Sequence, residues 1–457
     1  MLDQQIIQLQ DQIVEAIREC IKIKSVQDLP LHKMPFGQGV NQALEYALDL
    51  AKKLGFRTVN LDNMVGYAEY GTGEEMIAVL GHLDVVPPGE GWSYPPFGAI
   101  IDHGKIYGRG IVDDKGPIIG TLFALKAIKD LQLPLKKRVR IIFGTNEENG
   151  SKCVKHYVDQ GEEIPVAGFT PDGAYPIIYA EKGIVDCLCV KNISPQHGPL
   201  ILKDLKGGTA SNAVPSYAEA TIIGSQEQLD KIYQQLQPND SLQLEKGTQL
   251  LIKSYGITAH GSTPEIGKNA ITPLIVFLKD LDLDPKLKQL GEFVAEKIHQ
   301  ETDGQSLGIS LQDSISGKLT VNLGTIKLSE NQIAFELNIR YPVTKKYEDF
   351  MPQLQKMLDD ANIELQEIRH DPPLYVEPNT PLIQALKKVY EEKTGQEAEL
   401  LAIGGGTYAK AMPNIVAFGP TFPGEPDQDH QPDEHMSIDH ILKNVQIMAA
   451  AIYELAK

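Results

Sequence analysis

The feature that most constrains this chain is an apolar segment that ends in a short polar motif and occurs twice in the first third of the sequence. Residues 76–80 run directly into Gly81-His82-Leu83-Asp84, and residues 138–143 run into Gly144-Thr145-Asn146-Glu147-Glu148. Between them, residues 117–131 have the spacing of a helix with small and apolar residues on one side. A strand, a helix and a second strand, with polar residues at both carboxyl ends, predict an α/β sheet with a ligand site at that edge.

The middle of the chain has a different pattern. From about residue 184 to about residue 371 the strands alternate between polar and apolar residues, as in 334–340, which is typical of a sheet open to water on one face. The α/β pattern resumes after Pro372-Pro373. A chain of 457 residues is also too long for one ordinary core. We therefore predict a discontinuous domain interrupted by an insertion, with the ranges 1–183 plus 372–457, and 184–371.

Charge and cysteine usage limit the partners and the compartment. The formal net charge of −18 argues against nucleic acid or an anionic membrane as a partner, because both attract basic surfaces. The four cysteines are too few for a disulfide scaffold, so we expect buried thiols in a reducing compartment. We find neither the pattern of a signal peptide nor an apolar run of the ~18 residues that span a bilayer. The expected location is the cytoplasm.

His82 and Asp84 are the first candidate pair. They lie two residues apart on an extended segment, so their side chains point the same way. A metal-bound imidazole is usually oriented by a carboxylate on its other nitrogen, and Asp84 is placed to be that partner. The alternative is an ordinary histidine at a strand end whose hydrogen bonds are satisfied.

Two acidic pairs follow. Asp113 and Asp114 lie in a glycine-flanked turn before a helix, where one carboxylate can bridge two ions; the alternative is a helix N-terminal cap. Glu147 and Glu148 repel each other unless a cation or proton intervenes. One of them can bind a metal while its neighbour takes a proton from a metal-bound water. An exposed acidic turn is the alternative there.

A histidine near the carboxyl end completes the set. His430 follows a loop rich in glycine and proline, where irregular backbone is typical of a site. His435 and His440 compete for the role, but they fall at or inside the closing helix and we expect them at the surface. Asp172 is a weak signal by itself. Together these groups give the mixture of imidazole and carboxylate that a pair of zinc-like ions prefers.

In this order, the motifs resemble those of the M20 family of metallopeptidases, most closely the dipeptidase V type, and the resemblance runs nearly end to end. The motifs that carry it are Gly81-His82-Leu83-Asp84-Val85-Val86-Pro87, Gly108-Arg109-Gly110-Ile111-Val112-Asp113-Asp114-Lys115-Gly116, Glu147-Glu148, Pro171-Asp172, Ala259-His260-Gly261 and His430-Gln431-Pro432-Asp433-Glu434. The resemblance implies an α/β fold: a zinc-peptidase catalytic domain with a mixed β-sheet flanked by helices, plus an inserted α+β lid domain.

The resemblance also implies a role for each metal-site residue. Two zinc ions per chain, with manganese as the alternative, would be held by His82 and Asp172 on one side and by Glu148 and His430 on the other. Asp113 would bridge both. The implied catalytic groups are Asp84, which orients His82; Glu147, the general base and later proton donor; and His260, which stabilises the oxyanion. Asp433 stands where relatives often have Asn, which adds a negative charge.

Substrate-binding residues are implied in the same way. Besides His260, they are Asn212, Arg340, Gly405, Gly406 and Thr407. Arg340 would hold the free carboxylate of the substrate, a task that suits its bidentate guanidinium. Read without the resemblance, His260 is a loop histidine and Arg340 an exposed strand cation. The triple glycine 404–406 lacks the Lys-Ser/Thr continuation of a phosphate-binding loop.

The sequence therefore predicts a metallodipeptidase that cleaves the amide bond of dipeptides with free termini, β-Ala-Xaa included. A metal-bridging hydroxide would attack the carbonyl, with Glu147 as general base. Many relatives dimerise through the lid, but the long insertion resembles one that supplies this contact in a single chain, so we expect a monomer. The alternatives are a deacylase of N-acyl amino acids or succinyl-diaminopimelate, and a non-catalytic peptide-binding protein.

Overall fold

The chain folds as two compact units, each with its own hydrophobic core. The computed structural model describes residues 1–194, 198–235, 241–299, 301–426 and 428–457. The first unit comprises Met1–Tyr179, Val376–Leu401 and Gly406–Lys457, and the second comprises Ala180–Tyr375 and Ala402–Gly405. The chain thus leaves the first unit once for a long excursion and a second time for four residues.

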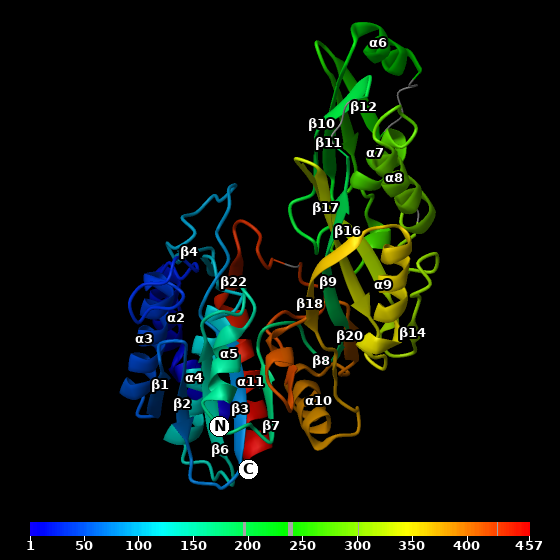
Figure 1. Ribbon diagram of the computed structural model, residues 1–457. Helices are drawn as coiled ribbons and strands as arrows, with labels where there is room; N and C mark the ends of the chain where they lie inside the picture. The colour runs from blue at the N-terminus through cyan, green and yellow to red at the C-terminus, as the bar shows by residue number, and fades with distance from the viewer. Residues whose placement is uncertain (195–197, 236–240, 300, 427) are drawn as a thin grey trace. The chain divides into compact units, whose positions relative to one another are not determined.

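A mixed sheet organises the first unit (Figure 1). The strands follow one another in the order β1 (Arg57–Leu61), β2 (Val65–Tyr70), β6 (Arg138–Gly144), β3 (Met76–His82), β7 (Ala167–Thr170), β21 (Ile415–Ala417), β8 (Ile177–Glu181) and β19 (Leu374–Tyr375), while β20 (Leu400–Ile403) also pairs with β8. β19 and the last two residues of β8 and of β20 belong to the second unit. β3 pairs in parallel with both β6 and β7, and β7 pairs in parallel with β21. β1 and β2 add antiparallel pairs at one edge.

Helices cover both faces of this sheet. They are α1 (Leu2–Gln8), α2 (Gln10–Lys22), α3 (Gln38–Lys53), α4 (Lys115–Asp130), α5 (Lys152–Asp159), α10 (Pro381–Thr394) and α11 (Ile438–Ala456), with the 3-10 turn η3 (Tyr408–Ala411). On β2, Gly66 faces Leu48 of α3, while the next residue, Tyr67, packs against Tyr157 of α5. Since successive strand residues point to opposite faces, α3 and α5 lie on opposite sides. A small sheet of β4 (Ile100–Asp102), β5 (Lys105–Tyr107) and β22 (His435–Ser437) completes the unit.

The second unit is an antiparallel sheet covered by helices on one face. Its strand order is β12 (Leu242–Lys246), β13 (Leu250–Tyr255), β11 (Tyr217–Gly224), β10 (Leu200–Gly207), β16 (Thr320–Ser329), β17 (Gln332–Tyr341), β9 (Gly183–Asn192) and β18 (Glu364–Asp371). The helical elements are α6 (Gln226–Gln235), α7 (Ile271–Leu278), α8 (Pro285–Lys297), α9 (Met351–Asp360), η1 (Pro264–Ile266) and η2 (Tyr347–Asp349), and a short hairpin joins β14 (Gln312–Asp313) to β15 (Gly317–Lys318). Apolar residues of alternate strand positions pack against α7, α8 and α9.

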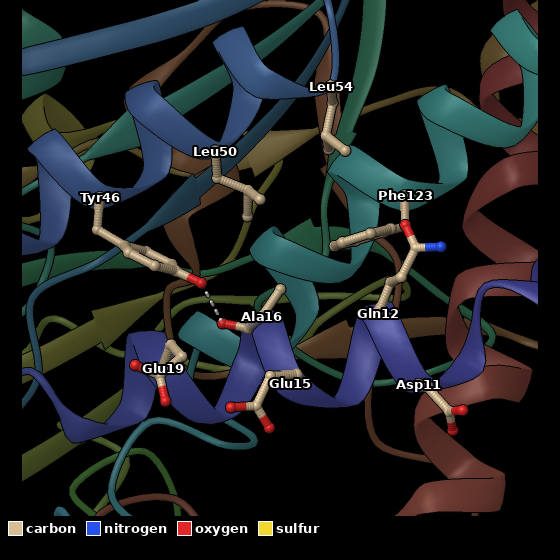
Figure 2. A pocket seen from close by; sticks show the side chains of 9 residues that line it. All are labelled: Asp11, Gln12, Glu15, Ala16, Glu19, Tyr46, Leu50, Leu54 and Phe123. Atoms are coloured by element: carbon tan, nitrogen blue, oxygen red, sulfur yellow. Dashed lines mark hydrogen bonds between the residues drawn. The ribbon is translucent and has the colours of Figure 1, made fainter.

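The mixed sheet flanked by helices and the separate α+β unit confirm the predicted fold class. A surface groove of about 440 Å³ lies between α2, α3 and α4, where the Tyr46 hydroxyl donates to the Ala16 carbonyl at 2.8 Å (Figure 2). Its lining residues include neither histidine nor cysteine, so the chemistry predicted from the sequence lies elsewhere in this unit. Among the helices that the structure describes, none combines the length and apolarity required to cross a membrane. The cytoplasmic location stays a prediction.

Candidate metal centre

The predicted ligands meet because three neighbouring parallel strands end at one edge of the sheet. β3 ends at His82, β6 ends at Gly144 just before Glu147 and Glu148, and β7 ends at Thr170 just before Asp172. His82 and Gly144 are register partners in the β3–β6 pair. The carboxyl ends of parallel strands therefore bring together side chains that are up to 90 residues apart in the sequence.

Asp113 joins the two histidines of the centre. Its Oδ1 lies 2.8 Å from His82 Nε2, and its Oδ2 lies 3.2 Å from His430 Nε2. His430 Nε2 also lies 3.2 Å from Glu148 Oε2, and His82 Nε2 lies 3.8 Å from Asp172 Oδ1. One carboxylate thus faces a separate histidine with each of its oxygens.

The ligand-type atoms form two groups that share Asp113. The first contains His82, Asp113 and Asp172, and the second contains Asp113, Glu148 and His430. Within each group the candidate ligand atoms lie within 4.8 Å of one another. Imidazole and carboxylate donors at this spacing are those that zinc or manganese accepts. All five residues that the sequence predicts as ligands are therefore brought together.

The hydrogen bonds of His82 show that a cation fits this place. Its Nδ1 lies 2.9 Å from the Asp84 carbonyl oxygen, which only accepts, so Nδ1 carries hydrogen. In the neutral ring Nε2 then presents a lone pair to the carboxylates of Asp113 and Asp172, and this buried atom has no hydrogen-bond donor. Glu148 Oε1 is likewise buried without a hydrogen-bond partner. A cation between these acceptors satisfies them all, because lone pairs that face one another repel.

Asp84 acts differently from the simple expectation that its carboxylate aims His82. The contact with His82 Nδ1 is made by the Asp84 backbone carbonyl, while the carboxylate lies 3.6 Å away. The two carboxylate oxygens accept the backbone N–H groups of Glu147 and Glu148 at 3.1 and 3.2 Å. Asp84 therefore orients His82 through its main chain and holds the Glu147–Glu148 turn through its side chain.

Glu434 holds the turn that carries Asp113. This fully buried carboxylate accepts the N–H groups of Gly110 and Val112 at 3.0 and 2.8 Å, and Arg109 Nη1 donates to it at 2.8 Å. The Asp113 N–H lies 3.3 Å from the same carboxylate. Burial and Asp113 raise the pKa of Glu434 to about 7, against the lowering effect of the backbone N–H groups and Arg109. The segment that contains His430 is thereby fastened to the Asp113 turn.

Tyr408 contacts two members of the first ligand group, His82 and Asp172. Its backbone N–H donates to Asp172 Oδ2 at 3.3 Å, and its ring meets the His82 ring edge-on at 5.9 Å. A Cβ on Gly144 would lie 1.9 Å from the Tyr408 hydroxyl, so glycine is required where β6 ends. The Tyr408 hydroxyl also lies 3.0 Å from Cys153 Sγ. The sequence motifs contain Arg109 and Glu434 without assigning either a role, and sequence reasoning missed Tyr408 altogether.

The other residues of the two acidic pairs have distinct environments. Asp114 precedes α4 without a side-chain capping bond; its Oδ2 accepts the His82 N–H at 3.1 Å. The peptide bond between Asp113 and Asp114 is cis. Burial, followed by the charge of Asp172, raises the pKa of Glu147 well above its usual value. Glu147 is thus a carboxyl group suited to holding a proton.

The competing histidines lie outside the centre. His435 Nε2 contacts Lys105 Nζ at 3.1 Å, and His440 Nδ1 pairs with Glu425 at 2.5 Å. His430 is instead the histidine near Asp113, and both carboxylate neighbours, Asp113 and Glu148, raise its pKa to about 11. The carboxylate of Asp433 accepts the Ser93 N–H at 2.7 Å, which gives this residue a defined structural contact.

In the second unit, Asn212 and His260 lie on adjoining loops. Gly261 N–H donates to the Asn212 carbonyl at 2.6 Å, and Asn322 Nδ2 donates to the carbonyls on either side, those of Ser211 and Ala213, at 2.9 Å each. The Ser262 N–H donates to His260 Nδ1 at 3.3 Å. In the neutral ring the hydrogen of His260 is then on Nε2, which makes this nitrogen a donor.

Arg340 lies on β17 of the same unit and is buried, with 4% of its surface exposed, rather than an exposed strand cation. Its Nε donates to Asn338 Oδ1 at 2.8 Å and its Nη1 to the Gly404 carbonyl at 3.3 Å. Burial lowers the pKa of Arg340 to about 10, with Asp186 and Asp371 opposing that effect. Gly405 belongs to the second unit, whereas Gly406 and Thr407 belong to the first, where the Thr407 hydroxyl caps η3.

A mixed α/β sheet with two groups of candidate metal ligands that share one carboxylate is the kind of site that metal-dependent hydrolases use. The sequence matches Peptidase family M20/M25/M40 over residues 78–454, and the chain belongs to this family.

Relatives of similar length agree with this assignment. The chain is 42% identical to "Putative dipeptidase YtjP" of Bacillus subtilis over 99% of both chains. It is 32% identical to a protein of Staphylococcus haemolyticus that is also named a putative dipeptidase, over 100% of this chain and 99% of the relative.

Solved structures share the fold. Human carnosine dipeptidase 1 has a TM-score of 0.60 at 18% identity, with 99% of this chain and 98% of the other covered. The dipeptidase Dug1p of Saccharomyces cerevisiae has a TM-score of 0.61 at 15% identity, with 99% and 97% covered. Members of this family are metal-dependent, and the two groups of candidate ligands agree with that property.

Proposed function

We propose that this protein is a metallodipeptidase that hydrolyses the amide bond of dipeptides with free termini. The observation that carries the proposal is the Asp113 carboxylate, which faces His82 with one oxygen and His430 with the other. Relatives that span nearly the whole chain and bear the name dipeptidase support the substrate class.

The metal ligands would be divided by the two groups around Asp113. His82 and Asp172 would hold one zinc ion, Glu148 and His430 would hold the other, and Asp113 would bind both; manganese is the alternative. When bound, such ions polarise the scissile carbonyl and acidify the attacking water. Asp84 would keep His82 and the Glu147–Glu148 turn in register through the contacts described above.

Glu147 would carry the proton through the reaction. As a carboxylate it accepts a proton from the attacking water, and as a carboxylic acid it donates that proton to the leaving amine. The amide C–N bond breaks, a C–O bond forms, and the products are one amino acid with a new carboxylate and one with a new amine. His260 Nε2–H would donate to the carbonyl oxygen as negative charge develops on it.

The second unit would supply the groups that recognise the substrate. Arg340 would bind the carboxylate of the dipeptide, since it is buried and contacts only neutral acceptors. Asn212, His260 and Gly405 would contribute further polar contacts, together with Gly406 and Thr407 of the first unit. We also propose that the chain works as a monomer, which light scattering would report as a mass near 50.3 kDa.

A panel of substrates and one variant test the proposal. Cleavage of β-Ala-His and other dipeptides, but not of N-acetyl amino acids, is expected; the reverse would favour a deacylase. Glu147→Gln should lower kcat by about 10²–10⁴-fold, the usual contribution of a general acid–base group, with metal content unchanged. Glu397→Gln, an exposed glutamate of the same unit, is the matched control. Normal cleavage by Glu147→Gln would refute the mechanism, and no cleavage by the wild type with two metals bound would favour a peptide-binding protein.

A further inference from the structure

Three arginines are buried among the residues that the structure describes, and one of them differs from the others in its hydrogen-bond acceptors. Arg109 donates directly to the Glu434 carboxylate at 2.8 Å, and Arg140 donates to the Glu69 carboxylate at 2.7 Å. Arg340 is equally buried but forms no ion pair with a described carboxylate; its hydrogen bonds go to an amide oxygen and a backbone carbonyl. The guanidinium of Arg340 is therefore oriented by neutral acceptors and not by a direct ion pair.

The amide that orients Arg340 is itself held in one orientation. Asn338 is fully buried on β17, and its Nδ2 donates to Asp186 Oδ1 at 2.6 Å across the β17–β9 pair, where these two residues are register partners. Because an ionised carboxylate only accepts, this bond fixes which end of the amide faces Asp186. Asn338 Oδ1 must then face Arg340 Nε.

Asp186 connects the same frame to the loop of Asn212. Its Oδ1 also accepts the Ser211 hydroxyl at 2.9 Å, and Ser211 immediately precedes Asn212. Two residues to which we assign substrate contacts, Asn212 and Arg340, are therefore positioned by one carboxylate. The Asn338 side chain lies between the Asp186 carboxylate and the Arg340 guanidinium, because it hydrogen-bonds to both.

The chemistry at position 338 decides whether Arg340 is available. An aspartate there would have nearly the same shape as asparagine, but it would pair with the guanidinium as Glu434 pairs with Arg109. An anionic ligand would then compete with an internal carboxylate. An amide supplies the hydrogen bond without the charge.

We propose that Asn338 is a specificity-determining positioning residue: it holds Arg340 in place of a carboxylate, with Asp186 fixing its orientation, so that Arg340 stays available for the carboxylate of the substrate. This inference rests on the proposed function and deepens it. It predicts that selectivity for a free C-terminal carboxylate depends on where the single negative charge of the Asp186–Asn338 pair is placed.

A charge-conserving swap tests the inference. The double variant Asp186→Asn/Asn338→Asp keeps the composition and allows the same hydrogen bond with its direction reversed, but moves the carboxylate next to Arg340. Kinetics are measured on a dipeptide and on its C-terminal amide. The ratio of the two kcat/KM values should fall by about 10- to 100-fold, mainly through KM of the free dipeptide, which is the range for losing hydrogen bonds to a charged group. The rate with the amide should change little.

The single variant Asp282→Asn is the matched control. Asp282 is an exposed aspartate of the same unit outside the Asp186–Asn338–Arg340 contacts, so the wild-type ratio should persist. If the swap does not fold, Asn338→Leu serves instead: it leaves Arg340 charged but removes its Nε partner, and a several-fold lower ratio is expected. The amide substrate reports folding within each preparation, because a misfolded enzyme loses both rates.

The outcomes separate this inference from the function on which it rests. Wild-type protein that cleaves no dipeptide refutes the proposed function. Wild-type protein that cleaves free and amidated dipeptides equally refutes the role of Arg340. A wild type that discriminates, together with a swap variant whose ratio is unchanged, overturns the role of Asn338 alone.

Discussion

The candidate binding residues of the two units carry opposite buried charges. In the first unit, five carboxylates surround two imidazoles: Asp84, Asp113, Glu147, Glu148 and Asp172 around His82 and His430. In the second unit, Arg340 is buried beside neutral acceptors. Isolated buried charge is costly unless an opposite charge accompanies it, so each unit favours a ligand of the opposite sign. The difference supports the proposal that the first unit binds metal cations and the second an anionic group of the substrate.

A second comparison lies within the class of buried arginines. Arg109 closes an ion pair with Glu434 and so serves the structure of the Asp113 turn. Arg340 forms no ion pair with a described carboxylate, and we propose that it serves a ligand instead. The predictions below test whether these two kinds of buried charge respond in opposite ways.

Removal of metal should have the largest effect. Chelation is expected to abolish dipeptide hydrolysis, because the carboxylates around Asp113 lose the cations that hold them together. It should also lower the free energy of unfolding by about 4 kcal/mol relative to protein with metal at 1,000 times its Kd. Dipeptide hydrolysis is assayed, and unfolding is followed by calorimetry, with and without chelator and again after zinc or manganese is added. An unfolding temperature that does not respond to chelator would contradict the carboxylate-rich character that we assign to this centre.

Arg109→Met should be the most destabilising of the single arginine changes. It leaves the buried Glu434 carboxylate without its cation, and breaking a buried ion pair in this way costs about 3–5 kcal/mol. Denaturant unfolding gives the value, and the same samples report metal content, which should fall because the Asp113 turn loses its support. The double variant Arg109→Met/Glu434→Gln should recover part of the loss, since the orphaned charge is then removed.

Arg340→Met should behave in the opposite way. Replacement of a buried charge that forms no ion pair by an apolar side chain of similar length should leave stability unchanged or raise it by about 1–4 kcal/mol. Selectivity for a dipeptide over its amide should fall by about 10- to 100-fold, with metal content unchanged. A destabilisation as large as that of Arg109→Met would show that Arg340 is a structural residue and erase the contrast.

Tyr408→Phe should have the smallest effect. It removes only the hydroxyl contact with Cys153 and keeps the ring beside His82 and the backbone bond to Asp172. A loss of about 1 kcal/mol in the free energy of unfolding is expected, with kcat nearly unchanged. A large fall in kcat would indicate that the hydroxyl, and not only the ring, positions the ligands.

Local signals were sufficient for the strands and helices that carry the site. The apolar stretches 76–80 and 138–143 lie within β3 and β6, and the predicted helix 117–131 corresponds to α4 (Lys115–Asp130). These stretches can be recognised from the sequence because hydrophobic periodicity is a property of neighbouring residues. His82, Glu148 and Asp172 meet for the same reason, since each lies at or just after the end of a strand in one parallel set; Asp113 and His430 lie on turns outside that set.

Contacts between distant segments were not predictable in this way. Arg109 and Glu434 are 325 positions apart, and neither has a neighbour in the sequence that hints at the other. Asn338 looks like any polar residue of an alternating strand, and only the pairing of β17 with β9 places it beside Asp186. The carboxylate of Asp84 was expected on His82, but the fold uses it for the Glu147–Glu148 turn, because the backbone carbonyl already occupies Nδ1.

The anchoring of the Asp113 turn by Glu434 also sets an order on biosynthesis. A nascent chain presents Asp113 to solvent 321 residues before the carboxylate that fixes its turn has been synthesised. Until Glu434 has been synthesised, the N–H groups of Gly110 and Val112 lack the carboxylate that accepts them in the folded protein. His430 is synthesised only four residues before Glu434. Loading of the proposed metal ions would therefore wait for the end of translation, and a ribosome that stalls in the second unit would leave a chain unable to assemble the centre.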